Sequence, residues 1–252
     1  MIAPMRIPPA AFGLLLLPFF LNDLAIVFLK IALLPTETLA YFYYRLPWIG
    51  QTLASLHPDS MRVLPYRQIL LWSQDLLVFV VGPLLFYYTG FRRAWFTWET
   101  LGLRDRPHLW DWIYSLVLAV QLFIVGWCLR LLLLQYQPEW EAFLWFGYDF
   151  PSELPWKWLI LIYASLSAGV VEELVFRGTL IPWLESRALP RWVAVVLAAL
   201  VFAGIHWCQG PLQLIQTFVL GLIWGAAFSV SRKLWPLILS HIFLDLFLFW
   251  PK

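Results

Sequence analysis

LIYASLSAGVVEELVFRGTLIPW, residues 161–183, is the most informative stretch of the chain. Its only charged side chains are Glu172, Glu173 and Arg177, and the other residues are apolar enough to lie in a lipid bilayer. A charged side chain at the centre of a membrane helix costs about 2.5–3.5 kcal/mol even on the gentlest scale. Such residues are tolerated where they pair or line a wet cavity, so this cluster is a candidate functional site.

The rest of the chain has the composition of a polytopic membrane protein. Of its 252 residues, 62% are hydrophobic and 13% are charged, whereas soluble domains usually carry about 25% charged residues. We therefore expect one all-α domain over residues 1–252, a polytopic membrane helical bundle of about seven to eight transmembrane helices. The expected partner of such an apolar bundle is the lipid bilayer. A net charge of +2 is too weak to suggest nucleic acid. Cys128 and Cys208 lack CxxC spacing, which argues against a metal knuckle or a disulfide framework.

Hydrophobic runs predict where these spans lie. The expected spans cover residues 10–34, 69–89, 112–134, 157–181, 191–207, 212–230 and 234–250. Residues 35–56 are predicted to form either an eighth, poorer span or an aromatic helix at the membrane interface.

Basic and acidic loops alternate along the chain and predict its orientation. Arginine or lysine side chains mark the 90–111, 182–191 and 231–233 segments, whereas the 135–156 loop carries only acidic charges. The positive-inside rule therefore predicts a multi-pass protein of the cell membrane with those three basic segments in the cytoplasm. The basic 45–67 segment fits this topology poorly.

The first motif is EELVFR, residues 172–177. On a helix Glu173 and Arg177 are four residues apart and share a face, which predicts an ion pair. Glu172 is predicted to point about 100° away from Glu173, toward a different cavity. A structural ion pair alone would explain Glu173 and Arg177 but would leave Glu172 unexplained, so we expect Glu172 to serve as a general base or acid.

Two later spans each contribute a histidine. Phe202 and His206 form an FxxxH motif near the end of one span, and His241 and Asp245 form an HxxxD motif in the last span. The spacing of four puts His241 and Asp245 on one helix face, where the carboxylate could fix the tautomer of the imidazole. Each histidine alone is compatible with an ordinary structural contact.

The ordered set of EExxxR, FxxxH and HxxxD on three spans resembles the CAAX-protease and bacteriocin-processing family (CPBP), also called the Abi family of glutamic intramembrane peptidases. The resemblance covers roughly residues 165–245, and it suggests a catalytic core over 155–250 preceded by helices without a recognised motif in 1–150. It implies intramembrane proteolysis: Glu172 and His206 would activate a water, and His241 and Asp245 would hold the oxyanion. Glu173, Arg177 and Phe202 would support this site.

Asp245 departs from the pattern of this family, because many members have asparagine there. An amide can donate a hydrogen bond to an oxyanion, whereas an ionised carboxylate cannot. Asp245 would therefore have to be protonated or to act only by orienting His241. The resemblance implies no cofactor, and its substrate would be a membrane-associated protein or peptide: a prenylated C-terminus, a leader peptide or a C-terminal sorting tail.

Two alternatives remain at this stage. One is a peptidase with zinc bound by His206, His241 and a glutamate, although no HExxH motif is present. The other is a proton-coupled transporter or a membrane scaffold without enzymatic activity, in which Glu172 and the histidines form a relay. All these hypotheses require the three motifs to lie close together. Counting residues from the basic turns, however, puts the motifs at different depths in the bilayer. The helices must therefore tilt, or residues 178–190 must lie partly within the bilayer.

Overall fold

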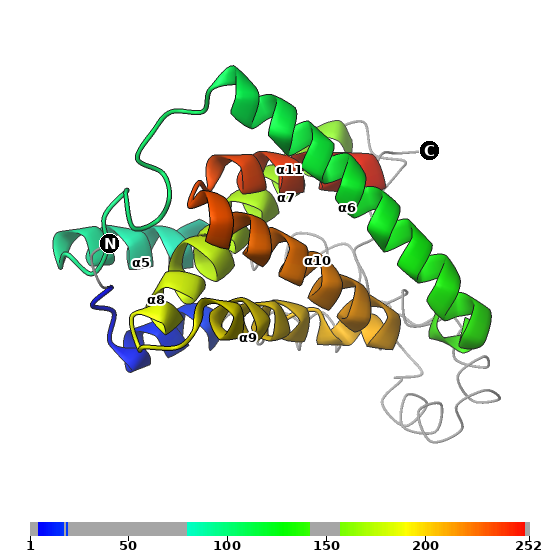
Figure 1. The fold of residues 1–252 in the computed structure, drawn as a ribbon, viewed down its shortest axis with the longest axis horizontal. Coiled ribbons are helices and arrows are strands. Elements are labelled where there is room, and N and C mark those ends of the chain that lie inside the picture. The colour runs from blue at the N-terminus through cyan, green and yellow to red at the C-terminus, as the bar shows by residue number, and fades with distance from the viewer. Residues whose placement is uncertain (1–4, 18, 20–79, 142–156, 250–252) are drawn as a thin grey trace, which may run out of the picture.

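The computed structural model describes residues 5–17, 19, 80–141 and 157–249, and every regular element within these ranges is a helix (Figure 1). The all-helical class is therefore confirmed for the described part of the chain. Other expectations lie outside it: most of the 10–34 and 69–89 spans, the 35–56 and 45–67 segments, and most of the acidic 135–156 loop. The expected total of seven to eight spans accordingly stays a prediction.

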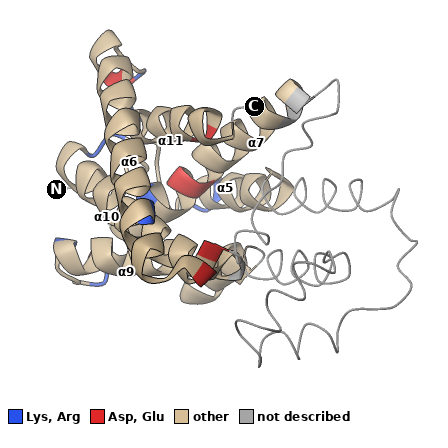
Figure 2. Ribbon diagram, turned by 90° about the vertical axis from the view of Figure 1, so that its right-hand side faces the viewer, with Lys and Arg blue, Asp and Glu red and all other residues tan. Residues whose placement is uncertain are grey.

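The helices follow the hydrophobic runs of the sequence closely. They are α5 (Gly82–Arg92), α6 (Leu109–Tyr136), α7 (Lys157–Glu172), the π-helix η3 (Glu173–Leu180), α8 (Ile181–Glu185), α9 (Arg191–Gly204), the short 3₁₀ helix η4 (Trp207–Gln209), α10 (Gly210–Ser231) and α11 (Trp235–Leu248). Within the described residues, α6 and α10 are long and apolar enough to cross a membrane, and α9 and α11 are shorter apolar helices. Figure 2 shows how sparse the charged residues are along the ribbon.

The central stretch of sequence forms one continuous helical run made of α7, η3 and α8. The predicted 157–181 helix is thus present, and it extends four residues further, to Glu185. Its middle is a π-helix, which the sequence did not predict. Pro182 lies within this run, at the start of α8, and has no backbone N–H to donate to the preceding turn.

Glycines let the helices that carry the motifs approach one another. A Cβ atom at Gly221 would lie 3.2 Å from the backbone of Ala199, and one at Gly225 would lie 2.9 Å from Val195. The GxxxG pair on α10 therefore packs against α9, a close approach that small residues at this spacing allow. Gly169 likewise allows α7 and α11 to approach closely, because a Cβ atom there would lie 2.6 Å from Ile242.

The three basic segments meet at one end of the bundle. Arg232 makes two 2.7 Å hydrogen bonds to Glu185, which joins the α10–α11 turn to the end of α8. Lys233 lies 3.0 Å from Asp111 at the start of α6, and the Leu234 amide donates to the carbonyl of Gly102. Segments predicted to share one side of the membrane are thus in direct contact.

Helical residues near the N-terminus pack against α8. The rings of Phe12 and Trp183 stack with their centroids 4.9 Å apart, and the Trp183 indole donates to the Ile7 carbonyl. From α5, the hydroxyl of Tyr87 shares a 2.9 Å hydrogen bond with Thr179 of η3. The N-terminal part of the chain therefore supports the helical run that carries the first motif.

Candidate active site

Two adjacent carboxylates mark the point where α7 becomes η3. Glu172 is the last residue of α7 and Glu173 is the first residue of η3, and both side chains are buried. Both carboxylates reach one imidazole, that of His241, instead of facing separate cavities as predicted.

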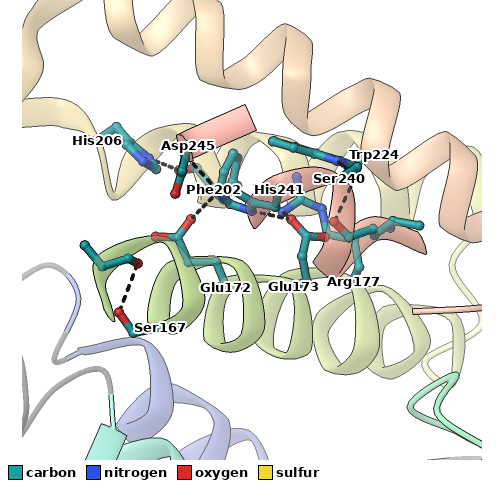
Figure 3. A network of polar contacts seen from close by, with 12 residues as sticks. Ser167, Glu172, Glu173, Arg177, Phe202, His206, Trp224, Ser240, His241 and Asp245 are labelled. Carbon is teal, nitrogen blue, oxygen red and sulfur yellow. Dashed lines mark hydrogen bonds and ion pairs between the residues drawn. The ribbon is translucent and has the colours of Figure 1, made fainter. Parts of the chain in front are cut away.

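His241 of α11 lies between three carboxylates (Figure 3). Its Nδ1 atom is 2.9 Å from Oε1 of Glu173, a hydrogen-bond distance. Its Nε2 atom is 3.8 Å from Oε2 of Glu172 and 3.9 Å from Oδ1 of Asp245. Asp245, the partner that the sequence predicts for His241, is thus beyond hydrogen-bond distance of the ring, whereas Glu173 is within it.

Arg177 neutralises Glu173, as the spacing of four residues predicted. Its Nη1 atom lies 2.9 Å from the same Oε1 atom that contacts His241, and both side chains are almost fully buried. Within the described residues, Nη2 of Arg177 and Oε2 of Glu173 have no hydrogen-bond partner. The guanidinium instead lies over two aromatic rings, 4.3 Å from the centroid of Phe202 and 5.1 Å from that of Trp224, at distances where cation–π attraction is effective.

His206 follows the C-terminal end of α9 and is half-buried. Its Nδ1 atom lies 2.9 Å from the carbonyl oxygen of Phe202. A carbonyl only accepts, so Nδ1 carries the proton and Nε2 presents a lone pair in the neutral ring. The Phe202 ring packs against both imidazoles, with centroid distances of 5.0 Å to His206 and 6.4 Å to His241. Phe202 thereby connects the second motif to the third.

All seven residues predicted for the site therefore belong to one connected network. They are Glu172, Glu173, Arg177, Phe202, His206, His241 and Asp245. The direct ion-pair and hydrogen-bond contacts join the first and third motifs, whereas His206 is linked to them through the Phe202 ring. Figure 3 shows the side chains of these residues grouped together, with Glu172 and Glu173 facing His241.

Trp224 and Ser240 are members of this network that the sequence analysis missed. The indole Nε1 of Trp224 donates a 2.9 Å hydrogen bond to Oγ of Ser240, and its ring stacks on His241 at a centroid distance of 4.6 Å. A signal was present, because Trp224 lies in the middle of a span between Gly221 and Gly225, far from the membrane interface where tryptophan usually gathers. A buried indole N–H also needs a partner.

Groups of three or more His, Cys, Asp or Glu residues arranged to hold a metal ion do not occur among the described residues. The carboxylates and imidazoles around His241 instead pair with one another and with Arg177. The arrangement can accept, hold and return protons inside a helical bundle.

Comparison with known protein families bears on the segment that carries this site. Residues 154–247 match the family model described as Type II CAAX prenyl endopeptidase Rce1-like. The resemblance to the CAAX protease family that the ordered motifs suggested is thereby confirmed, and the matched segment contains the whole network around His241. The match supports a membrane-embedded peptidase as the class of protein. No curated protein and no solved structure matches the chain.

Proposed function

We propose that this protein is a glutamic-type intramembrane endopeptidase that hydrolyses a peptide bond in a membrane-associated protein or peptide. The observation that carries the proposal is the contact of His241 with Glu172 and Glu173 inside a buried network. Peptide hydrolysis needs a base, a held water and donors directed at the developing oxyanion. The two helical regions that meet here, α7–η3 and α11, supply such groups.

Glu172 and His206 activate the water in this mechanism. The proposed tautomer of His206 leaves Nε2 free to accept a hydrogen bond from water, and the Glu172 carboxylate can take a water proton. The water oxygen attacks the carbonyl carbon of the substrate, which forms a tetrahedral oxyanion. Collapse of this intermediate breaks the C–N bond, and the proton held by Glu172 passes to the departing amine.

His241 stabilises the oxyanion. When both its nitrogens are protonated, Nδ1–H donates to Glu173 and Nε2–H is the donor available to the developing negative charge. Asp245, 3.9 Å from Nε2, orients that side of the ring. An ionised carboxylate accepts hydrogen bonds only, so Asp245 contacts the oxyanion directly only when it is protonated.

The three substrate classes considered for the chain are a prenylated C-terminus, a leader peptide and a C-terminal sorting tail. The description of the matched family favours the first, because it names a prenyl endopeptidase. A farnesylated CAAX peptide is therefore the first probe to use. Its unprenylated counterpart tests whether the lipid is required.

We further propose that the protein is a multi-pass protein of the cell membrane with residues 90–111, 182–191 and 231–233 in the cytoplasm. The contacts of Arg232 with Glu185 and of Lys233 with Asp111 support a common side for these segments. Their arginine and lysine content supports the cytoplasmic side.

The decisive experiment uses purified protein in liposomes and a quenched fluorescent peptide with a farnesylated CAAX terminus. We expect cleavage by the wild type and loss of cleavage in Glu172→Gln, which keeps the shape of the side chain but cannot serve as a base. Glu99→Gln is the matched control, because the Glu99 side chain is exposed and pairs only with Arg104 in the described structure. Full cleavage by Glu172→Gln would end the proposal.

A further inference from the structure

Trp224 of α10 is hydrogen-bonded through its indole N–H to α11, the helix that carries His241. Its indole N–H donates to the Ser240 hydroxyl, and that hydroxyl donates in turn to the carbonyl of Leu237 on α11. Trp224 is only 2% exposed. The hydrogen-bonded chain therefore fixes the indole relative to α11, one residue before His241.

The face of the same indole lies against the imidazole. The two rings have centroids 4.6 Å apart and an interplanar angle of 23°, a stacked arrangement, and the Phe202 ring meets His241 at 87° from another side. Rotation of the imidazole out of the stack would take Nδ1 away from Glu173 and Nε2 away from Glu172. The stack therefore holds the ring plane in which both contacts are possible.

Trp224 also contacts the other partner of Glu173. The guanidinium carbon of Arg177 lies 5.1 Å from the Trp224 ring centroid, and Nη2 of Arg177 has no hydrogen-bond partner within the described residues. A buried cation with an unused donor gains from an aromatic face. One side chain thus contacts both groups that bond to Oε1 of Glu173.

We propose that Trp224 is a positioning residue that holds the His241 imidazole with Nε2 directed at Glu172. This inference rests on the proposed peptidase function, in which the direction of Nε2 determines how the oxyanion is stabilised. Trp224 does not touch the reacting atoms, so its removal should lower kcat and leave KM for the substrate nearly unchanged.

The test compares Trp224→Leu, Trp224→Phe and Ser240→Ala with the farnesylated peptide in liposomes. Trp224→Leu removes the stacked aromatic face that holds the imidazole, so we expect it to lower kcat by about tenfold. Trp224→Phe keeps an aromatic face but loses the indole N–H, and we expect a partial rescue, with kcat about threefold below the wild type. Ser240→Ala should resemble Trp224→Phe, because it breaks the same hydrogen bond.

Trp235→Phe is the matched control. It makes the same chemical change on α11, and the Trp235 indole N–H has no hydrogen-bond partner among the described residues. We expect kcat within twofold of the wild type. An equal fall of kcat in Trp235→Phe and Trp224→Phe would assign the effect to general packing and overturn the inference.

A second readout needs no substrate. The chain has 4 histidines, so ¹⁵N-histidine labelling gives few signals, and His241→Asn assigns those of His241. We expect the Nδ1 and Nε2 shifts of His241 to move in Trp224→Leu and to stay in place in Trp235→Phe. If Glu172→Gln abolishes cleavage while Trp224→Leu changes neither kcat nor these shifts, the inference fails and the peptidase function stands. If Glu172→Gln cleaves normally, the peptidase function itself fails.

Discussion

Glu173 and His241, 68 residues apart in sequence, are joined by a 2.9 Å contact between Oε1 and Nδ1. The same oxygen lies 2.9 Å from Nη1 of Arg177. One carboxylate oxygen therefore serves as acceptor for a side chain four residues away and for a side chain on another helix. Glu173 joins the supporting ion pair to the proposed catalytic imidazole. Its contribution to stability and its contribution to activity can therefore be measured separately in variants of its two partners.

A double-mutant cycle on Glu173 and Arg177 tests this dual role. Glu173→Leu leaves a buried, unpaired guanidinium, and we expect it to lower the free energy of unfolding by about 3–5 kcal/mol. Adding Arg177→Met removes that charge, so the double variant should recover much of the stability. Cleavage should stay absent in both variants, because His241 has lost its acceptor in each. Denaturant titration in micelles and the farnesylated-peptide assay measure the two properties, and recovery of cleavage in the double variant would contradict the role of Glu173 toward His241.

Asp245→Asn tests how the third carboxylate acts. The amide can donate a hydrogen bond to an oxyanion and adds no negative charge beside Glu172, so we expect Asp245→Asn to cleave at least as fast as the wild type. Asp245→Leu removes both polar atoms and should lower kcat by about 10²-fold. The ratio of the two kcat values is the measurement. Equal losses in both variants would show that the carboxylate itself is required.

His206 can be probed with two amides of different length. Asparagine keeps a donor near the position of Nδ1, which faces the carbonyl of Phe202, whereas glutamine puts its amide near the position of Nε2. Neither amide is a base, so we expect both His206→Asn and His206→Gln to lower kcat by about 10²–10⁴-fold. His206→Asn should retain the thermal stability of the wild type more fully, because it keeps the backbone hydrogen bond. Substantial cleavage by either variant would remove His206 from the mechanism.

Metal removal separates the proposed mechanism from the zinc alternative. The roles assigned to Glu172, His206 and His241 require no metal, so we expect cleavage to be unchanged after dialysis against a strong chelator. Metal analysis of the active protein should find less than one zinc per chain. Loss of cleavage on chelation, restored by added zinc, would favour zinc bound by the histidines and a glutamate.

The sequence predicted the parts of the site that depend on local spacing. The Glu173–Arg177 pair follows from a separation of four residues. The ordered motifs also resemble the family whose model residues 154–247 match. These features can be predicted from the sequence because each depends on the residue spacing within one helix or on short motifs.

Other features depend on the way helices pack and could not be read from spacing. Residue spacing does not predict the π-helix η3, nor the contact of both glutamates with His241. Spacing along α11 points to Asp245 as the partner of His241, whereas the hydrogen-bond contact of the ring comes from Glu173 on another helix. The different bilayer depths expected for the three motifs assume long spans perpendicular to the membrane. In the structure, α9 and α11 are each only 14 residues long.

Gly169 offers a test of the packing that brings Glu173 to His241. A Cβ atom at this position would lie 2.6 Å from Ile242 and 3.2 Å from the carbonyl oxygen of Ile238, so α7 and α11 would have to move apart. Overpacking of this kind costs about 1–3 kcal/mol, and we expect Gly169→Ala to lower both the melting temperature and kcat. Gly126→Ala is the matched control, because the nearest atoms to a Cβ there are 4.0 Å away. Its melting temperature and kcat should equal or slightly exceed those of the wild type, since alanine favours the helix over glycine. A Gly169→Ala variant with wild-type kcat would mean that the Glu173–His241 contact tolerates separation of the helices, and the close approach of α7 to α11 would then be unnecessary for activity.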